Sequence, residues 1–404
     1  MKVSGNIMKT LLIFSVLPIL ATCFVLSFQL DSNTTSEHSE RECGSSFEKL
    51  WLDIVFVVDN SAGMTNEGLA KVSANMKSVL EGVTIGLRSW HQTTRVGLIT
   101  YNREATVVAG LNTFTSYDDF SSTVTSTLSQ VSSEELSDLA AGFSEASALF
   151  DRWHLDSRKQ FQKVVILYTN IVKYTKNFGF SPLTEANNLK EKKVQIITVA
   201  MNDDDTLNAL LSTYATLPFD FNIADADLKG EIQNALLAVN CFCPSGGWVQ
   251  YRDTYGDFTS KKYAVCIYPS SQQLLWVHAM RQCYDVNRYS YLLNEYSVEK
   301  HNFSYEVIKA HGQPSHPYRY HIGLAYYNNA WTWESTLGLN GNVADFTYWN
   351  AGFPVADNNK VVVMNVETSD GSRWENANRV LDYAYFACET RACDVDNYCD
   401  TSVA

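Results

Sequence analysis

Short apolar runs alternate with helix-like segments through the first 240 residues, and this alternation limits the folds that the chain can adopt. The runs are rich in Val, Ile and Leu, as expected for strands that are buried on both faces of a parallel sheet. Between them, apolar residues recur at spacings of three and four, as in Leu69, Val72 and Met76, which predicts helices that pack on the sheet. We therefore predict an open, doubly wound, Rossmann-like α/β domain. Its strands are expected at Leu52–Val58, Arg95–Tyr101, Thr106–Leu111, Lys163–Thr169, Val194–Ala200 and Phe219–Ile223.

The composition of the sequence changes after Asn240. Cysteines and turn residues lead into a region rich in aromatic residues, with clear helical patterns only at Gln272–Cys283 and Ser297–Ile308. Such a region predicts a loop-rich α+β domain held together by disulfides. We therefore divide the chain into an export segment over 1–30, a linker over 31–49, a first domain over 50–240, a second domain over 241–392 and a tail over 393–404.

The N-terminus has the composition of an export signal. Lys2 and Lys9 precede an apolar run from Leu11 to Leu30. A run of about 20 residues fits either a cleaved signal peptide or the uncleaved anchor of a type II membrane protein. Both alternatives place the rest of the chain outside the cytosol. We expect a secreted protein, bound to a membrane only if the segment is not removed, and glycosylation at the sequons of Asn33 and Asn302.

Cysteine content and charge narrow the classes of function. Of nine cysteines, one lies in the export segment, and the remaining even number suits disulfides in an oxidising compartment. The net charge of −13 repels nucleic-acid phosphates, so no nucleic-acid partner is expected. No motif assembles a nucleophile, a base and an orienting group, so we do not expect an enzyme.

The segment Asp59-Asn60-Ser61-Ala62-Gly63 follows the first predicted strand directly, at the sheet edge where ligands of open α/β domains bind. In this motif, and in the order and spacing of elements over residues 50–240, the chain resembles the von Willebrand factor A family. That family has a metal-ion-dependent adhesion site that begins with Asp-x-Ser-x-Ser. The resemblance implies a site for a divalent cation, Mg or Ca, formed by Asp59, Ser61, Ser137 and Asn170.

This motif departs from the family pattern at two positions. Gly63 stands where the second serine belongs, and Asn170 replaces an aspartate, whereas Ser137 keeps the hydroxyl of the usual threonine. The loss of one carboxylate and one hydroxyl should weaken metal binding. The alternative is that Asp59 and Ser61 only bond to the following loop and cap the helix. We expect no required cofactor, with Mg or Ca at this site as the other possibility.

A series of landmarks after Asn240 occurs in the order of a C-type lectin-like domain, which the second half resembles. The paired architecture resembles the nematode C-type lectin proteins that carry an A domain, and it implies carbohydrate binding and innate defence. The landmarks are Cys243-Pro244 with Trp248, Cys266 with Tyr268, the segment Trp276–Cys283, His321-Ile322-Gly323-Leu324, Trp331-Thr332-Trp333-Glu334 and Phe386-Ala387-Cys388-Glu389.

The resemblance also implies a disulfide pattern. The family pattern pairs Cys283 with Cys388 and Cys243 with Cys266, while Cys43 and Cys241 would join the ends of the first domain, as in similar domains. Cys393 and Cys399 are the pair that is then left, although eight cysteines allow 105 pairings. A further family disulfide would lie near Val361 and Arg379, and neither position is a cysteine.

The calcium-binding motifs of sugar-binding lectins are degenerate in this sequence. Those members hold calcium with Glu-Pro-Asn and Trp-Asn-Asp, where this chain has Phe353-Pro354-Val355 and Trp374-Glu375-Asn376. Since Phe and Val side chains carry no ligating oxygen, we do not expect calcium-dependent sugar recognition. Aromatic rings near this loop could stack on sugars, although a place in the core is favoured. They are Trp331, Trp333, Tyr348, Trp349 and Phe353.

Taken together, these patterns predict an extracellular, non-enzymatic recognition or adhesion protein whose partners are proteins or glycans. One alternative is a metal-dependent adhesion receptor that acts through Asp59, Ser61 and Ser137. The other is a structural protein of the extracellular matrix.

Overall fold

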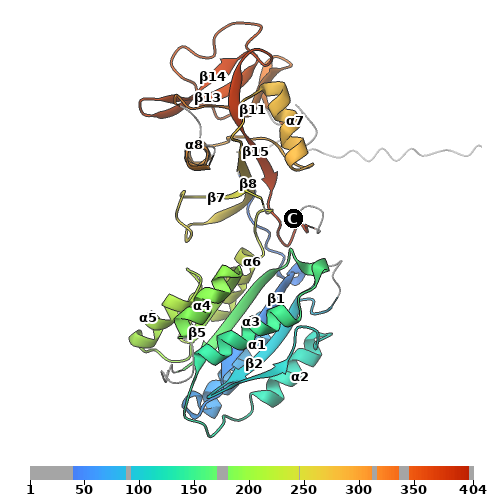
Figure 1. Ribbon diagram of the computed structural model, residues 1–404, viewed down its shortest axis with the longest axis vertical. Helices are drawn as coiled ribbons and strands as arrows, with labels where there is room; N and C mark the ends of the chain where they lie inside the picture. The colour runs from blue at the N-terminus through green and yellow to red at the C-terminus, as the bar shows by residue number, and fades with distance from the viewer. Residues whose placement is uncertain are drawn as a thin grey trace, which may run out of the picture. The chain divides into compact units, whose positions relative to one another are not determined.

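The structure, a computed structural model, describes residues 40–87, 92–170, 181–244, 246–311, 316–335 and 345–399 (Figure 1). The predicted export segment and the Asn33 sequon lie outside these residues. Within the described ranges, every helix is too short or too polar to cross a lipid bilayer.

A six-stranded sheet with the order β3-β2-β1-β4-β5-β6 forms the centre of the N-terminal domain. Neighbouring strands are parallel, except that β3 runs antiparallel to β2. The central strand β1 is buried along its whole length, as expected when helices cover both faces. The predicted doubly wound domain is thus confirmed. The strands are β1 Leu52–Asp59, β2 Arg95–Tyr101, β3 Ala105–Ala109, β4 Gln162–Thr169, β5 Val194–Ala200 and β6 Asp220–Asn222.

Each face of this sheet has its own apolar core. Helices α1, α2 and α6 pack against Phe56 and Ile166 on one face, and α3, α4 and α5 pack against Val57 and Leu167 on the other. Each of these helices begins after a Ser, Thr or Asp whose side chain accepts a hydrogen bond from the first turn, which stabilises the helix start. The helices are α1 Asn66–Leu80, α2 Tyr117–Thr127, α3 Leu139–Arg152, α4 Pro182–Glu191, α5 Asp205–Tyr214 and α6 Leu228–Val239.

The C-terminal domain is built on a nine-stranded sheet whose main path is β14-β13-β11-β15-β8-β7. The last strand, β15, lies within this path, parallel to β11 and antiparallel to β8. The short strands β9 and β10 also pair with β15, and β12 pairs with β11. The strands are β7 Val249–Arg252, β8 Lys262–Pro269, β9 Leu274–Leu275, β10 Tyr291–Leu292, β11 Arg319–Tyr327, β12 Ala330–Trp333, β13 Val362–Thr368, β14 Gly371–Ala377 and β15 Tyr383–Arg391.

Helices α7 (Trp276–Val286) and α8 (Val298–His311) supply apolar residues to two separate clusters of this domain. The sequence pattern predicted that the first helix begins at Gln272. It begins instead at Trp276, because Leu274–Leu275 pairs with β15 as strand β9. The helical spacing of apolar residues thus extends beyond the helix, into residues that pair with β15 as a strand.

The structure contains the disulfides Cys43–Cys241, Cys243–Cys266, Cys283–Cys388 and Cys393–Cys399. The first three are the pairs that the resemblance implies, and the fourth is the pair that is then left. Cys283–Cys388 joins α7 to β15. Cys43–Cys241 spans 198 residues and joins the point where the chain enters the N-terminal domain to the point where it leaves.

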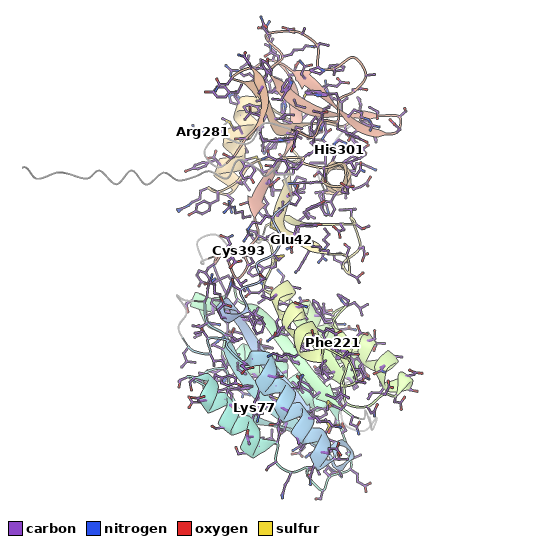
Figure 2. The ribbon with its side chains drawn as sticks, turned by 180° about the vertical axis from the view of Figure 1, so that it is seen from behind. Glu42, Lys77, Phe221, Arg281, His301 and Cys393 are labelled. Carbon is purple, nitrogen blue, oxygen red and sulfur yellow. A yellow bond between two sulfur atoms is a disulfide. The ribbon has the colours of Figure 1, made fainter. Side chains whose placement is uncertain are left out.

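The end of the predicted linker and the start of the predicted tail are in contact with each other. The Ala264 amide of β8 donates to the Arg41 carbonyl at 2.8 Å, and the Arg41 guanidinium forms an ion pair with Asp394 at 2.8 Å. Figure 2 labels Glu42 and Cys393 in this region, although they lie far apart in the sequence. Residues that precede the N-terminal domain in the sequence therefore bond to residues that follow it.

Lys300, on α8, is buried between two carboxylates. Its ammonium lies 2.8 Å from Glu40 and 2.9 Å from Glu389. Burial alone would lower the pKa of Lys300, but Glu389 and Glu40 raise it above its ordinary value. Burial also raises the pKa of Glu40 from 4.5 to about 7, although Lys300 acts in the opposite direction. The cluster holds two acidic groups for one basic group, so a proton on Glu40 relieves its excess negative charge.

We predict that Glu40→Gln flattens part of the pH dependence of stability. The pKa of Glu40 is raised to about 7 in the folded state, so the folded state binds its proton more tightly than the unfolded state does. The resulting contribution to the free energy of unfolding is fully present below pH 4.5 and is lost as the pH rises towards 7. The measurement is the Tm of the full chain across this range, in which the decline of the wild type should be shallower in the variant. Glu42→Gln, at an exposed pair with Lys261, is the control and should keep the wild-type slope. Equal slopes for Glu40→Gln and the wild type would contradict the assignment.

Candidate functional sites

The carboxylate of Asp59 lies at the carboxyl end of β1 and is fully buried. One of its oxygens accepts the Ser61 amide N–H at 2.9 Å. The other accepts the hydroxyls of Ser137, at 3.0 Å, and of Thr169, at 3.2 Å. These donors come from the loop after β1, the loop before α3 and the end of β4. Three loops at one edge of the sheet therefore meet at a single carboxylate.

Burial raises the pKa of Asp59, and the hydrogen bonds from Ser61, Ser137 and Thr169 oppose this shift. The carboxylate is thus held by neutral donors rather than by a basic side chain. In the part of the chain that the structure describes, no three His, Cys, Asp or Glu side chains gather as a group that could hold a metal ion.

Asn170, the fourth predicted site residue, follows β4 directly. Its side-chain amide donates to the carbonyl of Gly63 at 2.6 Å, and its own carbonyl accepts the side-chain amide of Asn202 at 2.9 Å. Asn170 therefore joins the β4 end to the loop that carries Asp59 and Ser61. The structure places all four predicted residues at the same edge of the sheet.

In the C-terminal domain, the peptide bond between Phe353 and Pro354 is cis, and Asn376 of β14 holds the residue that follows. The Asn376 side chain accepts the Val355 amide N–H at 2.8 Å and donates to the Val355 carbonyl at 2.9 Å. It also donates to the Lys360 carbonyl at 2.9 Å. One buried amide therefore uses its oxygen and its nitrogen to fix the loop against the strand.

Glu375, next to Asn376 in β14, accepts a hydrogen bond from the Asn350 side chain at 2.7 Å. Residues Phe353, Pro354, Val355, Glu375 and Asn376 therefore lie along one loop and strand, where Phe353 and Val355 contribute no ligating side-chain oxygen. Asn350 was not singled out in the sequence, because an isolated Asn beside a Trp carries no distinctive pattern.

The tryptophans near this loop pack mainly on one another. Trp333 and Trp374 are fully buried, with ring centroids 5.7 Å apart. Trp349 lies 5.7 Å from Trp374 and 5.1 Å from Trp331. These edge-on and tilted contacts place Trp333 and Trp374 in the core and pack Trp331 and Trp349 against it, which agrees with the alternative that the sequence favoured.

Exposed aromatic rings occur instead at the turn between β11 and β12. Tyr326 and Tyr327 are 45% and 48% exposed, and the ring centroid of Tyr326 lies 5.2 Å from that of Trp331. Asn328 and Asn329 both have a positive φ, as a tight hairpin turn requires. The Tyr-Tyr-Asn-Asn pattern was the sequence signal for this hairpin, and the sequence reasoning did not use it.

Residues 53–235 match the von Willebrand factor type A domain. This segment is thus similar to that family, and we call it the A domain. Its sheet order, with β1 between β2 and β4, agrees with the predicted fold.

A curated relative covers most of the chain. It is C-type lectin domain-containing protein 160 of Caenorhabditis elegans, which is 24% identical over 375 residues, or 90% of this chain. The chain spans 56% of the length of that relative. The C-terminal domain, which we call the lectin-like domain after this similarity, contains the Cys283–Cys388 disulfide that the resemblance implies.

Two solved structures illustrate the likeness of each domain. Proximal thread matrix protein 1 from the mussel byssus, described with a zinc-occupied MIDAS motif, is 19% identical with a TM-score of 0.38, and the match covers 48% of this chain and 47% of that chain. Human lithostathine is 21% identical with a TM-score of 0.30, and the match covers 36% of this chain and 98% of that chain.

In the arrangement that the structure shows, the A domain edge lacks the full set of oxygen ligands of the family motif. Both oxygens of Asp59 already accept protein donors, and Asn170 presents an N–H rather than an oxygen to the neighbouring loop. Hard dications require several oxygen ligands, with carboxylates among them. The lectin-like loop fails in the same way, since Asn376 is fully engaged with backbone groups.

The sequon residue Asn302 lies exposed on α8 of the lectin-like domain, whereas Phe303 and Ser304 beside it are buried. The folded chain thus leaves the amide of this side chain accessible to solvent. The glycosylation of Asn302 stays a prediction.

Proposed function

We propose that this protein is an extracellular, non-enzymatic recognition or adhesion protein whose partners are glycans or proteins. A von Willebrand factor type A domain and a C-type lectin-like domain in one chain, with four disulfides, support this role. We further propose that the N-terminal segment directs secretion. If the partner is a microbial glycan, the same binding would serve innate defence.

The observation that carries the proposal is the exposed tyrosine pair of the β11–β12 hairpin. Tyr326 and Tyr327 present large amphipathic rings to solvent, on a tight turn that limits their motion. Such rings stack on sugar faces and anchor protein interfaces. We therefore place the recognition surface of the lectin-like domain at this hairpin, beside Trp331.

The test is an array of glycans and extracellular proteins, probed with the secreted full chain. We expect that Tyr326→Ala or Tyr327→Ala weakens binding to the strongest ligand by about tenfold. Tyr284→Ala is the matched control, because that ring is 60% exposed on α7 of the same domain and should leave binding unchanged. Equal binding by all three variants would remove the hairpin from the site. The absence of any ligand would favour a structural role in the matrix instead.

The alternative candidate is a metal-dependent adhesion receptor that acts through the A domain. The observation in its favour is the group of hydroxyls around the Asp59 carboxylate, from Ser137 and Thr169, because such oxygens are ligands for Mg. Calorimetry of the full chain with Mg or Mn tests it. Heat of binding that disappears in Asp59→Asn would support this candidate, and no heat would exclude it.

A further inference from the structure

We infer that the side-chain amides of Asn170 and Asn376 replace the cations that the family motifs of the two domains would hold. Each amide links the two segments that a cation would otherwise bridge. Recognition by this protein would then be independent of divalent cations. This inference rests on the proposed recognition function, although its test needs no partner.

In the A domain, the Asn170 amide links the end of β4 to the loop after β1. Its N–H donates to the Gly63 carbonyl at 2.6 Å, beside Thr169, whose hydroxyl donates to Asp59. An aspartate at position 170 could not make the first contact, because an ionised carboxylate only accepts hydrogen bonds. It would place a second negative charge near the Asp59 carboxylate, and a cation would be needed to hold the two loops together.

In the lectin-like domain, the side-chain amide of Asn376 links two segments in the same way, through three hydrogen bonds. It links β14 to Val355 through one accepted and one donated hydrogen bond, and to Lys360 through another. An aspartate could keep only the accepted bond from the Val355 N–H. The amide therefore supplies both the donor and the acceptor that the loop requires, and the loop is held in place before any ligand arrives.

The two sites are independent observations of one substitution. They lie in different domains, one directly after β4 and the other on β14, and each has an asparagine whose nitrogen donates to a backbone carbonyl. A neutral amide joins two backbone segments without adding charge. A carboxylate cluster at the same point would repel itself unless an ion neutralised it.

The test restores the cation chemistry of the A domain. The variant Asn170→Asp/Gly63→Ser supplies the missing carboxylate and hydroxyl, and Gly63 does not belong to the glycines with a left-handed backbone. We expect that 5 mM Mg or Mn raises the Tm of this variant by about 5–10 °C, with a matching heat in calorimetry. The same ions should leave the Tm of the wild type unchanged. Gly63→Ser alone is the control, because it keeps the amide and should behave as the wild type does.

Three results would overturn the inference. They are a rise in the wild-type Tm with Mg, Mn or Ca that is lost in Asp59→Asn, a response of Gly63→Ser alone, and no response of the double variant. A second measurement addresses the lectin-like domain. Asn376→Asp should increase proteolytic cleavage near Val355, whereas cleavage of the wild type should be the same with calcium and with a chelator. Calcium-dependent protection of the wild type would also overturn the inference. A failed search for ligands would affect only the proposed function.

Discussion

Replacement of Lys300 with methionine is expected to lower the free energy of unfolding of the lectin-like domain by about 3–5 kcal/mol at pH 7. The ammonium of Lys300 is completely buried and pairs with both Glu40 and Glu389. Methionine fills a similar volume but leaves two buried carboxylates without a counter-charge. The loss should shrink as the pH falls below about 7, because burial raises the pKa of Glu40 to about 7 and its protonation removes one of the two negative charges.

The measurement is urea unfolding of the full chain, with its disulfides intact, followed by tryptophan fluorescence. Lys309→Met is the control on the same helix, since its pair with Glu306 is exposed and should contribute less than about 1 kcal/mol. The double variant Lys300→Met/Glu40→Gln should regain part of the lost stability, because one unpaired charge is removed. Wild-type stability in Lys300→Met would contradict the proposed importance of the buried pair.

Replacement of Glu295 with leucine should lower the free energy of unfolding by about 4 kcal/mol or more. Glu295 is fully buried, and four side chains contact its carboxylate. Leucine cannot accept a hydrogen bond, so it would leave these polar groups buried and unsatisfied. The contacts are Asn365 Nδ2 at 2.7 Å, Trp374 Nε1 at 2.8 Å, His301 Nδ1 at 2.8 Å and Tyr320 OH at 3.3 Å.

His301, labelled in Figure 2, connects this network to β14 through a contact of 3.1 Å between its Nε2 atom and the Ser372 carbonyl. The Glu295→Gln variant keeps one acceptor oxygen and should lie between leucine and the wild type. Glu306→Leu, on the exposed side of α8, is the control and should unfold at nearly the wild-type urea concentration. If Glu295→Leu unfolds at the wild-type midpoint, the network does not stabilise the domain.

The architecture of both domains could be predicted because it depends on periodic or ordered features. Runs such as Val194–Ala200 have the composition of buried parallel strands, and the structure has β5 at these residues. The residues around Asp59 could be predicted because parallel strands end at a common edge. The spacing of the cysteines became informative only through resemblance to a family, since it does not itself define a pairing.

The hydrogen-bonded roles of particular side chains could not be predicted. Glu295 and Lys300 are charged residues of the kind that usually face solvent, and only tertiary packing brings their partners from distant strands. The direction of the Asn170 amide follows from the approach of the Gly63 carbonyl. The ion pair between Arg41 and Asp394 could not be predicted for the same reason. Arg41 lies in the predicted linker, and no sequence pattern there indicates a distant partner.

The disulfide between Cys43 and Cys241 has a mechanical consequence. In the proposed adhesion role the chain would carry tension, and the disulfide spans 198 residues that include the whole A domain. A pull applied to the two ends would pass through the covalent bridge and leave the A domain unloaded. In a force-extension experiment, the oxidised chain should lengthen only by the segments outside the four disulfide loops. The extra length of the A domain should appear after reduction, together with that of the loops of the lectin-like domain.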